Sequence, residues 1–531
     1  MLLRNPVTGR HRLLTCALAV TAAASTAALT GCDAQTTTLT IQGFGANTVL
    51  NAKAVADLVV RVASHGGDAK HATATLDGRP VAVTIDGNML DVAPGPLADG
   101  PHTIVIKAGG AKLIRTFTVD TTPPTLTVDA PKTAPSLRSP VTLTGTATGA
   151  TKVEAGTQVI AVTGGHFSLT VPTPPAGLKV IAVDAAGNES VKVVSVSVTH
   201  PLMRGVHLTG YGWNATVLRN PVLQLARQHR INTIELDVKE EDGYVDFNTS
   251  VRLAHQIHAV RVLYNPHAVI PFLHKMGVRV VGRIVCFRDP KLAAWAWAHH
   301  HRDWDVQAPG GKAPYKSAKY GGAAFTNWAS PDVQAYNIAL ATEAAKLGFD
   351  DVMFDYVRRP DGPLATMRFP GAGRTTAPVG VANFVRDASG PVRANGAYLG
   401  LAVFGVSATR PKEVGQDIGA MARYVDYVAP MVYPSHWGPG EYGVKNPNAQ
   451  PYDIVNRSLK DFQKKVAGTT AQVMPWLQDF SLGVHYGVPQ VKAQILAAQR
   501  DGLGSFLLWN AGCVYQGAAL AVDRKMPRTT D

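Results

Sequence analysis

The chain has 531 residues, of which 46% are hydrophobic and 17% are charged, and its formal net charge is +13. This length predicts two to four domains, and the composition excludes intrinsic disorder as the main state. Gly and Pro are too few for a collagen-like chain, and the four cysteines exclude a disulfide scaffold or a cysteine-rich metal cluster. No run of Lys and Arg exceeds two residues, which disfavours nucleic acid as a partner.

Residues 1–32 have the pattern of an export signal. Three arginines precede an apolar run, Leu13 to Leu29, which is shorter than a typical transmembrane helix. The run ends in Leu29-Thr30-Gly31-Cys32, which resembles the cleavage box of bacterial lipoproteins, where the Cys receives lipid. This resemblance implies a lipid anchor at Cys32 on the outer face of the bacterial cell membrane. An ordinary secretory signal, which would give a secreted protein, is the alternative. The basic charge suits anionic lipids or cell-wall polymers as partners.

Residues 33–200 have the pattern of small β-domains. Short Val-, Thr- and Ile-rich runs are broken by Gly, Pro, Asp or Asn about every 8–12 residues. The junction Thr122-Pro123-Pro124 separates two units, residues 33–121 and 122–200. This junction and the turn Asp184-Ala185-Ala186-Gly187-Asn188 resemble those of tandem bacterial immunoglobulin-like modules. We therefore expect two immunoglobulin-like β-sandwiches that serve as spacers or wall contacts.

From residue 201 onward, short apolar runs alternate with amphipathic helical segments, and all eight tryptophans lie in this part of the chain. Several helical segments end at a Gly just before the next strand, as helix C-termini prefer. Eight runs in about 320 residues predict a (β/α)8 TIM barrel over residues 201–531. No Gly-x-Gly-x-x-Gly follows the first run, which disfavours a dinucleotide fold. The expected strands are Arg204 to Leu208, Thr233 to Val238, Val278 to Val285, Asp351 to Asp355, Leu399 to Phe404, Tyr427 to Tyr433, Gln472 to Trp476 and Ser505 to Trp509.

The carboxyl ends of the expected strands carry the residues of interest, because TIM-barrel enzymes place their chemistry there. Four of these ends carry a tryptophan (Trp213, Trp437, Trp476 and Trp509), and at least three carry a carboxylate. Indole faces stack on sugar rings, and carboxylates supply the acid and the nucleophile or base of glycosidic cleavage. The pattern therefore predicts a site for a polysaccharide or a cell-wall glycan.

Asp355 is the first candidate catalytic residue, since it directly follows an apolar run, where a buried charge is costly. We expect it to be ionised, with Arg358 holding its pKa low. Asp479 is the first candidate for the general acid, because its apolar neighbours would raise its pKa. Asp237 is the second candidate, although the adjacent Lys239 favours a polar network. The expected substrate-binding residues are Trp213, Lys239, Arg358, Tyr433, His436, Trp437, Trp476 and Trp509.

Other chemistries have less support, and no metal and no cofactor is expected. His207 stands alone on the first strand, and His299-His300-His301 has no carboxylate at ligand spacing. No Gly-x-Ser-x-Gly occurs, which excludes the usual serine-hydrolase elbow. Cys286 is predicted to be a packing residue of the barrel.

Several ordered segments resemble a known family: those from Ile234 to Lys239, from Gly348 to Pro360, from Val403 to Gly405 and from Asp426 to Trp437. Together they are similar to a glycoside hydrolase family of bacterial surface proteins, first catalogued as a domain of unknown function and related to the clan of TIM-barrel glycosidases. The resemblance covers about residues 202–520 and implies a (β/α)8 barrel and polysaccharide hydrolysis, but it supplies no catalytic residue. A glycan-binding or scaffolding lipoprotein without activity is the alternative, because the fifth strand end has no acid.

Overall fold

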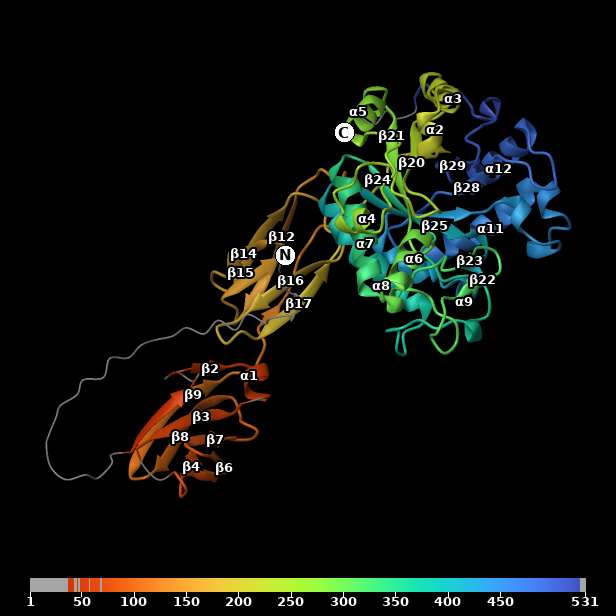
Figure 1. Ribbon diagram of the computed structural model, residues 1–531. Coiled ribbons are helices and arrows are strands. Elements are labelled where there is room, and N and C mark those ends of the chain that lie inside the picture. The colour runs from red at the N-terminus through yellow and green to blue at the C-terminus, as the bar shows by residue number, and fades with distance from the viewer. Residues whose placement is uncertain (1–36, 43–44, 46–47, 57, 67–68, 526–531) are drawn as a thin grey trace, which may run out of the picture. The chain divides into compact units, whose positions relative to one another are not determined.

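The computed structural model describes residues 37–525 apart from 43–44, 46–47, 57 and 67–68 (Figure 1). The expected export signal, with Cys32, lies outside the described residues. The chain divides into two compact units. One contains the chain up to Thr127 with Thr146–Phe167 and Ile181–Val191, and the other contains Val128–Gly145, Ser168–Val180 and the chain from Lys192 onward. Within the described ranges, no helix is long and apolar enough to cross a membrane.

The N-terminal part of the chain is built of two sheets around a small apolar core. Its long hairpin joins two nine-residue strands through Gly109 and Gly110, whose φ angles of 54° and 81° fit the two-residue turns that match strand twist. One short helix, α1 (Ala52–Ala56), accompanies the sheets. The sheets contain, in spatial order, β1 (Thr38–Gln42), β3 (Val60–His65), β7 (Met89–Val92) and β6 (Val83–Asp86), and then β2 (Thr48–Leu50), β9 (Ala111–Val119), β8 (Gly100–Ala108), β4 (Thr73–Leu76) and β5 (Arg79–Val81).

The stretch from Thr125 to Val198 is also rich in strands. The prediction of β-structure before residue 200 is therefore confirmed, while the immunoglobulin-like topology stays a prediction. The strands, sheet by sheet, are β10 (Thr125–Leu126), β12 (Val141–Thr148) and β15 (His166–Val171); β11 (Thr133–Ala134) and β18 (Ser197–Val198); and β14 (Gln158–Ala161), β13 (Lys152–Ala155), β16 (Leu178–Val183) and β17 (Glu189–Val194).

The C-terminal part of the chain is an eight-stranded parallel barrel, as predicted. The last strand pairs in parallel with the first, so that Arg204 lies opposite Phe506 and the sheet closes. The seventh position holds two short segments, because the chain between them contains Pro475, which cannot donate to the ladder. Around the barrel the strands are β19 (Arg204–Leu208), β20 (Thr233–Lys239), β21 (Arg279–Val285), β24 (Asp351–Asp355), β25 (Tyr398–Phe404), β26 (Tyr427–Met431), β27 (Gln472–Val473) with β28 (Trp476–Gln478), and β29 (Phe506–Trp509).

Helices follow the strands and surround the barrel (Figure 1). Three of the glycines predicted to end helices, Gly277, Gly348 and Gly502, have positive φ angles of 73°, 97° and 79°, the conformation that helix ends use. The α-helices are α2 (Gly210–Asn214), α3 (Thr216–Arg227), α4 (Arg252–Gln256), α5 (Pro266–Lys275), α6 (Pro290–Ala298), α7 (Pro331–Lys346), α8 (Ala377–Ala394), α9 (Pro411–Val414), α10 (Ile418–Met421), α11 (Pro451–Val466) and α12 (Val488–Arg500).

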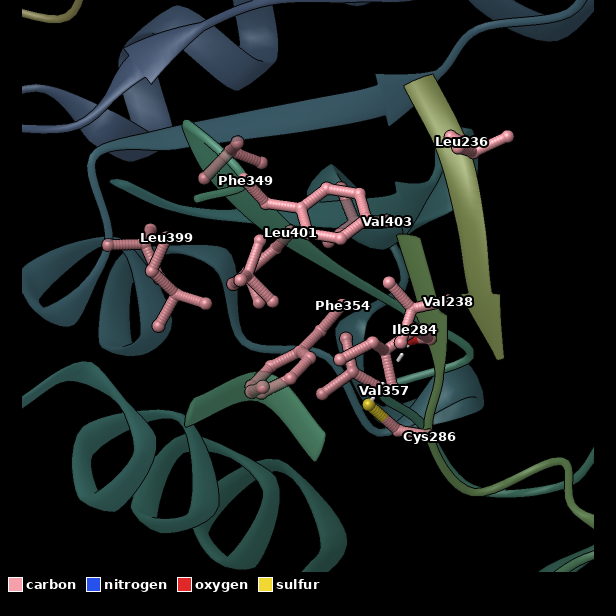
Figure 2. Packing of buried hydrophobic residues seen from close by; sticks show 14 of the residues in the cluster. Leu236, Val238, Ile284, Cys286, Phe349, Phe354, Val357, Leu399, Leu401 and Val403 are labelled. Atoms are coloured by element: carbon pink, nitrogen blue, oxygen red, sulfur yellow. Dashed lines mark hydrogen bonds between the residues drawn. The ribbon is translucent and has the colours of Figure 1, made fainter. Parts of the chain in front are cut away.

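Alternation along the strands separates the outer core from the barrel interior. Leu236, Phe354 and Leu401 pack toward the helices in the core that Figure 2 shows. A second cluster, which includes Met353 and Trp476, fills the interior. Alternation places acidic residues on this inner face as well, and they form the candidate site described next. Cys286 is fully buried and unpaired, as is the other described cysteine, Cys513.

Candidate active site

A cavity of about 350 Å³ opens at the carboxyl ends of the barrel strands. Its wall is largely aromatic, and its two carboxylates are Asp355 and Glu241. Asp355 is the last residue of β24, and Glu241 lies on the turn that follows β20. The lining residues are Glu241, Arg283, Lys319, Tyr320, Asp355, Tyr356, Ala402, Phe404, Gly405, Val406, Met431, Tyr433, His436, Trp437, Trp476 and Trp509.

Arg283 on β21 connects the carboxylates of the site. Its Nη1 donates to Asp237 Oδ1 at 2.7 Å, and its Nε and Nη2 donate to Asp355 Oδ2 at 3.0 and 2.7 Å. The same Nη2 also donates to Glu241 Oε1. Strand register produces this convergence, since Asp237 lies opposite Arg283 and the adjacent strand brings Asp355 opposite Val285. A single buried guanidinium thus bonds three acids, of which Asp355 and Glu241 line the cavity.

The acids around Arg283 differ in protonation. Burial raises the pKa of Asp237 to about 8, although Arg283 opposes this shift. Burial also raises the pKa of Glu235 well above its usual range. Burial would raise the pKa of Glu241 too, but the charge of Arg283 prevails and lowers it to about 2. At neutral pH, Glu241 is therefore ionised, whereas burial favours the protonated forms of Asp237 and Glu235.

His207 on β19 lies beside these acids and beneath a tryptophan. Its Nδ1 is hydrogen-bonded to Glu235, and its Nε2 lies 3.6 Å from Asp237 Oδ2. Its ring stacks on Trp509 with centroids 4.1 Å apart, and Arg283 lies 4.9 Å from the centroid of the same indole. The arrangement fixes Trp509 against the cavity floor.

His207, Glu235 and Asp237 place possible metal-ligand atoms within 4.8 Å of one another. Two features oppose a cation at this position. The guanidinium of Arg283 already donates to Asp237 Oδ1, and burial favours the protonated forms of both acids, which are poor ligands. We therefore assign these three residues to a hydrogen-bonded network.

Six of the residues expected from the sequence line the cavity together. Asp355 lies at its floor, and Tyr433 and Trp476 are also almost fully buried there. The indoles of Trp476 and Trp509 are perpendicular, with centroids 5.5 Å apart. The remaining two expected residues in the lining are His436 and Trp437.

The two other expected acids do not line the cavity. Asp237 is fully buried behind it, bonded to Arg283. Asp479 follows β28 and turns toward the loop after β29, where its Oδ2 accepts from the Gln516 backbone at 2.9 Å. Burial raises the pKa of Asp479 to about 6, in the direction expected from its apolar neighbours. Its role as the general acid stays a prediction.

Three expected substrate-binding residues lie outside the lining for identifiable reasons. A break in the strand register between Asp237 and Lys239 turns Lys239 away from the barrel interior, and its Nζ bonds Asp289 at 2.7 Å. Helix α2 begins just after β19 and carries Trp213 into the outer core. Arg358 lies 4.2 Å from the centroid of Phe404 and pairs with Asp361, so Arg283, not Arg358, contacts Asp355.

Arg283, Glu241, Tyr320 and Tyr356 are site residues that the sequence analysis did not select. Arg283 offered a usable signal, since it is a cation in the middle of an otherwise apolar run, Val280 to Val285. Glu241 belongs to an acidic turn in which no residue stands out. Tyr356 has a φ of 46°, unusual for a residue other than glycine, and its backbone N–H donates to Asp355 Oδ1 at 2.6 Å. Only the folded chain shows this geometry.

A parallel (β/α)8 barrel with paired carboxylates and an aromatic wall defines the class of TIM-barrel hydrolases that act on glycans. A family model described as "putative glycosyl hydrolase domain" matches residues 205–515. The match covers more than half of the chain, so the chain belongs to this glycosyl hydrolase family. The family expected from the sequence is thereby confirmed.

Solved structures with similar folds include three of bacterial origin. A hypothetical protein from Ruminiclostridium thermocellum is 27% identical over 34% of this chain and 90% of its own, with a TM-score of 0.31. The PgaB (BpsB) glycoside hydrolase domain from Bordetella bronchiseptica is 14% identical over 59% and 95%, with a TM-score of 0.43. A chitinase from Chromobacterium violaceum is 14% identical over 60% and 99%, with a TM-score of 0.35. Among curated protein sequences, none matches the chain.

Proposed function

We propose that the protein is an exported, lipid-anchored glycoside hydrolase that cleaves a polysaccharide at the cell surface, with Asp355 and Glu241 as its catalytic carboxylates. The observation that carries the proposal is the shared contact at Arg283, whose Nη2 donates to both carboxylates at the cavity floor. The aromatic lining supplies the stacking surfaces that a sugar ring needs.

The spacing of the two carboxylates supports a retaining reaction. Because Asp355 Oδ2 and Glu241 Oε1 both accept from Arg283 Nη2, these two oxygens lie closer together than the carboxylates of an inverting enzyme. Retaining glycosidases hold their carboxylates about 5–5.5 Å apart, whereas inverting enzymes need about 6.5–9.5 Å to admit a water molecule. In a retaining reaction, one carboxylate attacks the anomeric carbon and the other protonates the departing oxygen.

The surroundings of each carboxylate suggest its role. Asp355 is fixed at a strand end by three N–H donors from Arg283 and Tyr356, which suits a nucleophile. Glu241 sits on a turn, and its side chain is 30% exposed, so a bound sugar can reach it. A sugar that separates Glu241 from Arg283 would remove the charge that lowers its pKa, and burial would then raise it. Glu241 would thus become a proton donor only once substrate is bound.

A non-catalytic glycan-binding lipoprotein is the second candidate function. The observation that favours it is the low pKa of Glu241 in the free protein, which leaves this carboxylate without a proton to donate at neutral pH. A binder would retain glycans without releasing new reducing ends.

Release of reducing ends from a panel of polysaccharides tests the proposal. We expect hydrolysis by the wild-type protein and a loss of about 10⁴-fold or more in Asp355→Asn. Asp242→Asn, on the same turn as Glu241 but exposed, serves as a matched control and should retain activity. Normal hydrolysis by Asp355→Asn would overturn the site assignment, and retention without hydrolysis by the wild type would favour the binder.

Aryl glycosides, whose leaving groups need no protonation, identify the acid. If Glu241 is the acid, Glu241→Gln should lose about 10²–10⁴-fold on natural glycans and far less on aryl glycosides. Asp479→Asn should then behave like the wild type on both substrates. If instead Asp479→Asn loses activity on natural glycans but not on aryl glycosides, and Glu241→Gln behaves like the wild type, Asp479 is the general acid.

A further inference from the structure

One wall of the cavity alternates cations with aromatic rings. Lys319 Nζ lies 5.1 Å from the ring centroid of Tyr320, and Arg288 lies 4.3 Å from the same centroid. Arg288 also lies 5.2 Å from the ring centroid of Tyr356, so its guanidinium has an aromatic ring on each of two sides. Lys319, Tyr320 and Tyr356 line the cavity. We call Lys319, Tyr320, Arg288 and Tyr356 the cationic wall, although Arg288 itself contacts the two tyrosines from outside the cavity lining.

Arg358 is a further cation beside Tyr356, but it lies outside the cavity lining. Its guanidinium lies 5.0 Å from the Tyr356 centroid and 4.2 Å from that of Phe404. The residue is 1% exposed, and its Nε and Nη2 have no hydrogen-bond partner within the described part of the chain. A buried guanidinium with free donors is costly unless an acceptor reaches it. Arg358 therefore adds positive charge close to the wall, but its free donors lie outside the cavity lining.

The positive charge of the wall is poorly balanced by acids. Asp361 pairs with Arg358 at 3.2 Å, and its own side chain is 44% exposed. In the described ranges, no carboxylate forms a salt bridge with Lys319 or Arg288. The two acids in the cavity lining, Asp355 and Glu241, are both engaged by Arg283. Lys319 and Arg288 thus leave the wall with a net positive charge.

The charge of Lys319 also affects the pKa of a second residue in the cavity lining, His436. Burial lowers the pKa of His436, and the positive charge of Lys319 lowers it further. His436 also lines the cavity, so the positive charge of Lys319 affects the electrostatic potential inside the site as well as at the outer surface. An anion bound beside Lys319 would oppose this effect and raise the pKa of His436.

We propose that the cationic wall binds an anionic substituent of the glycan, either a carboxylate or a phosphate. Lys and Arg are the residues that recognise these groups, while the tyrosine rings between them can lie against the sugar ring that bears the charge. The proposal rests on the glycan-cleaving function proposed above, and it adds that acidic glycans are preferred over neutral ones.

Calorimetry on the full-length Asp355→Asn protein tests this inference without turnover. One probe pair is tetragalacturonate and its carboxyl-reduced counterpart, and a second pair is a sugar phosphate and the same sugar without phosphate. We expect the anionic member of at least one pair to bind about tenfold more tightly or better, as a charged hydrogen bond allows. The pair that shows the preference identifies the anion.

Substitution of Lys319 tests the wall itself. Lys319 is exposed, so Lys319→Ala should fold normally, lose the preference for the anionic probe and leave binding of the neutral probe unchanged. Lys312→Ala, an exposed lysine on the same segment, is the matched control. In NMR titrations, the anionic probe should raise the pKa of His436 in the protein that retains Lys319.

Equal binding of both members of each pair, or an unchanged preference in Lys319→Ala, would overturn the inference. The two proposals fail separately. Hydrolysis of neutral glycans without an acidic preference would leave the hydrolase function intact and remove the cationic-wall proposal. If anionic probes bind in a way that depends on Lys319 but no glycan is hydrolysed, the cationic-wall proposal stands and the hydrolase proposal is wrong.

Discussion

Arg283 donates through both Nε and Nη2 to a single oxygen of Asp355, Oδ2, at 3.0 and 2.7 Å. The other oxygen of Asp355 accepts from the Tyr356 backbone at 2.6 Å. The carboxylate is therefore held at both oxygens by groups on two adjacent strands and the turn after them. This clamp fixes the orientation of Asp355 before any substrate arrives, which is how a rigid fold lowers the cost of positioning a reacting group.

Arg283→Lys should impair both folding and activity. An ammonium group cannot reproduce the fork that bonds Asp237, Asp355 and Glu241 together, and it leaves buried acids without their partner. Breaking a buried ion pair costs about 3–5 kcal/mol, so we expect a clear fall in melting temperature together with a loss of hydrolysis. Thermal denaturation and reducing-end assays measure the two effects.

Arg386→Lys is the control for this substitution, because Arg386 is 46% exposed and pairs only with a neighbouring surface acid. It should leave both measurements unchanged. An Arg283→Lys protein with normal stability and normal hydrolysis would show that the clamp is dispensable.

Much of the barrel could be predicted because its signal is local. β19 and β24 have the predicted bounds, and the other strands differ only at their ends. The exception is the seventh position, where Pro475 interrupts the ladder and splits the expected strand into two short segments. Apolar runs buried on both faces identify such strands without any knowledge of their neighbours.

The candidate site could be predicted only in part, because its geometry depends on register and on irregular backbone. The position of Asp355 follows from its strand, and the lining by Trp476 and Trp509 follows from theirs. The outward turn of Lys239 depends on a break in strand pairing, which leaves no mark in the sequence. The convergence on Arg283 likewise requires the relative register of three strands.

Asp305 should make the stability of the protein depend on pH. Burial raises the pKa of Asp305 to about 8, with a smaller contribution from Asp289, and neither carboxylate oxygen has a hydrogen-bond partner among the described residues. The unfolded value is about 3.9, so the folded state holds this proton more tightly. Its stabilising effect is complete below about pH 4 and is lost as the pH rises toward 8.

Asp305→Asn removes this titration, since an amide stays neutral. Between pH 4 and pH 8, the melting temperature of the wild type should therefore fall relative to that of the variant. Asp303 is an exposed acid two residues earlier, and Asp303→Asn should show the same pH dependence of the melting temperature as the wild type. Parallel curves for the wild type and Asp305→Asn would mean that Asp305 does not titrate in this range.

Cys32 should determine where the protein resides. If Leu29-Thr30-Gly31-Cys32 is a lipoprotein cleavage box, Cys32→Ala should move the protein from the membrane fraction to the medium or block its processing. Cys16→Ala, within the segment that processing would remove, is the control and should leave the distribution unchanged. Normal processing and membrane retention of Cys32→Ala would exclude the lipid anchor.

His200 should be required for the stability of the barrel, because it completes a buried charge network near the N-terminal ends of the strands. Its Nε2 lies 2.5 Å from Asp351 Oδ1, and Arg279 Nε donates to the other oxygen of Asp351 at 2.5 Å. The His200 ring also packs edge-on against Tyr398 and Tyr427, with centroids 4.5 and 4.9 Å away. His200→Ala would therefore leave a cavity and remove one partner of a buried carboxylate.

We expect His200→Ala to destabilise the protein by about 3 kcal/mol, because it leaves a cavity and removes a hydrogen-bond partner of the buried Asp351 carboxylate. Chemical denaturation monitored by tryptophan fluorescence reports on the barrel, because all eight tryptophans lie after residue 200. His267→Ala, an exposed histidine on α5, should leave the transition unchanged. His200 lies far along the strands from the cavity, since Asp351 begins β24 and Asp355 ends it. Below the transition, His200→Ala should thus retain its hydrolytic rate, and an unchanged denaturation midpoint would show that the network contributes no net stability.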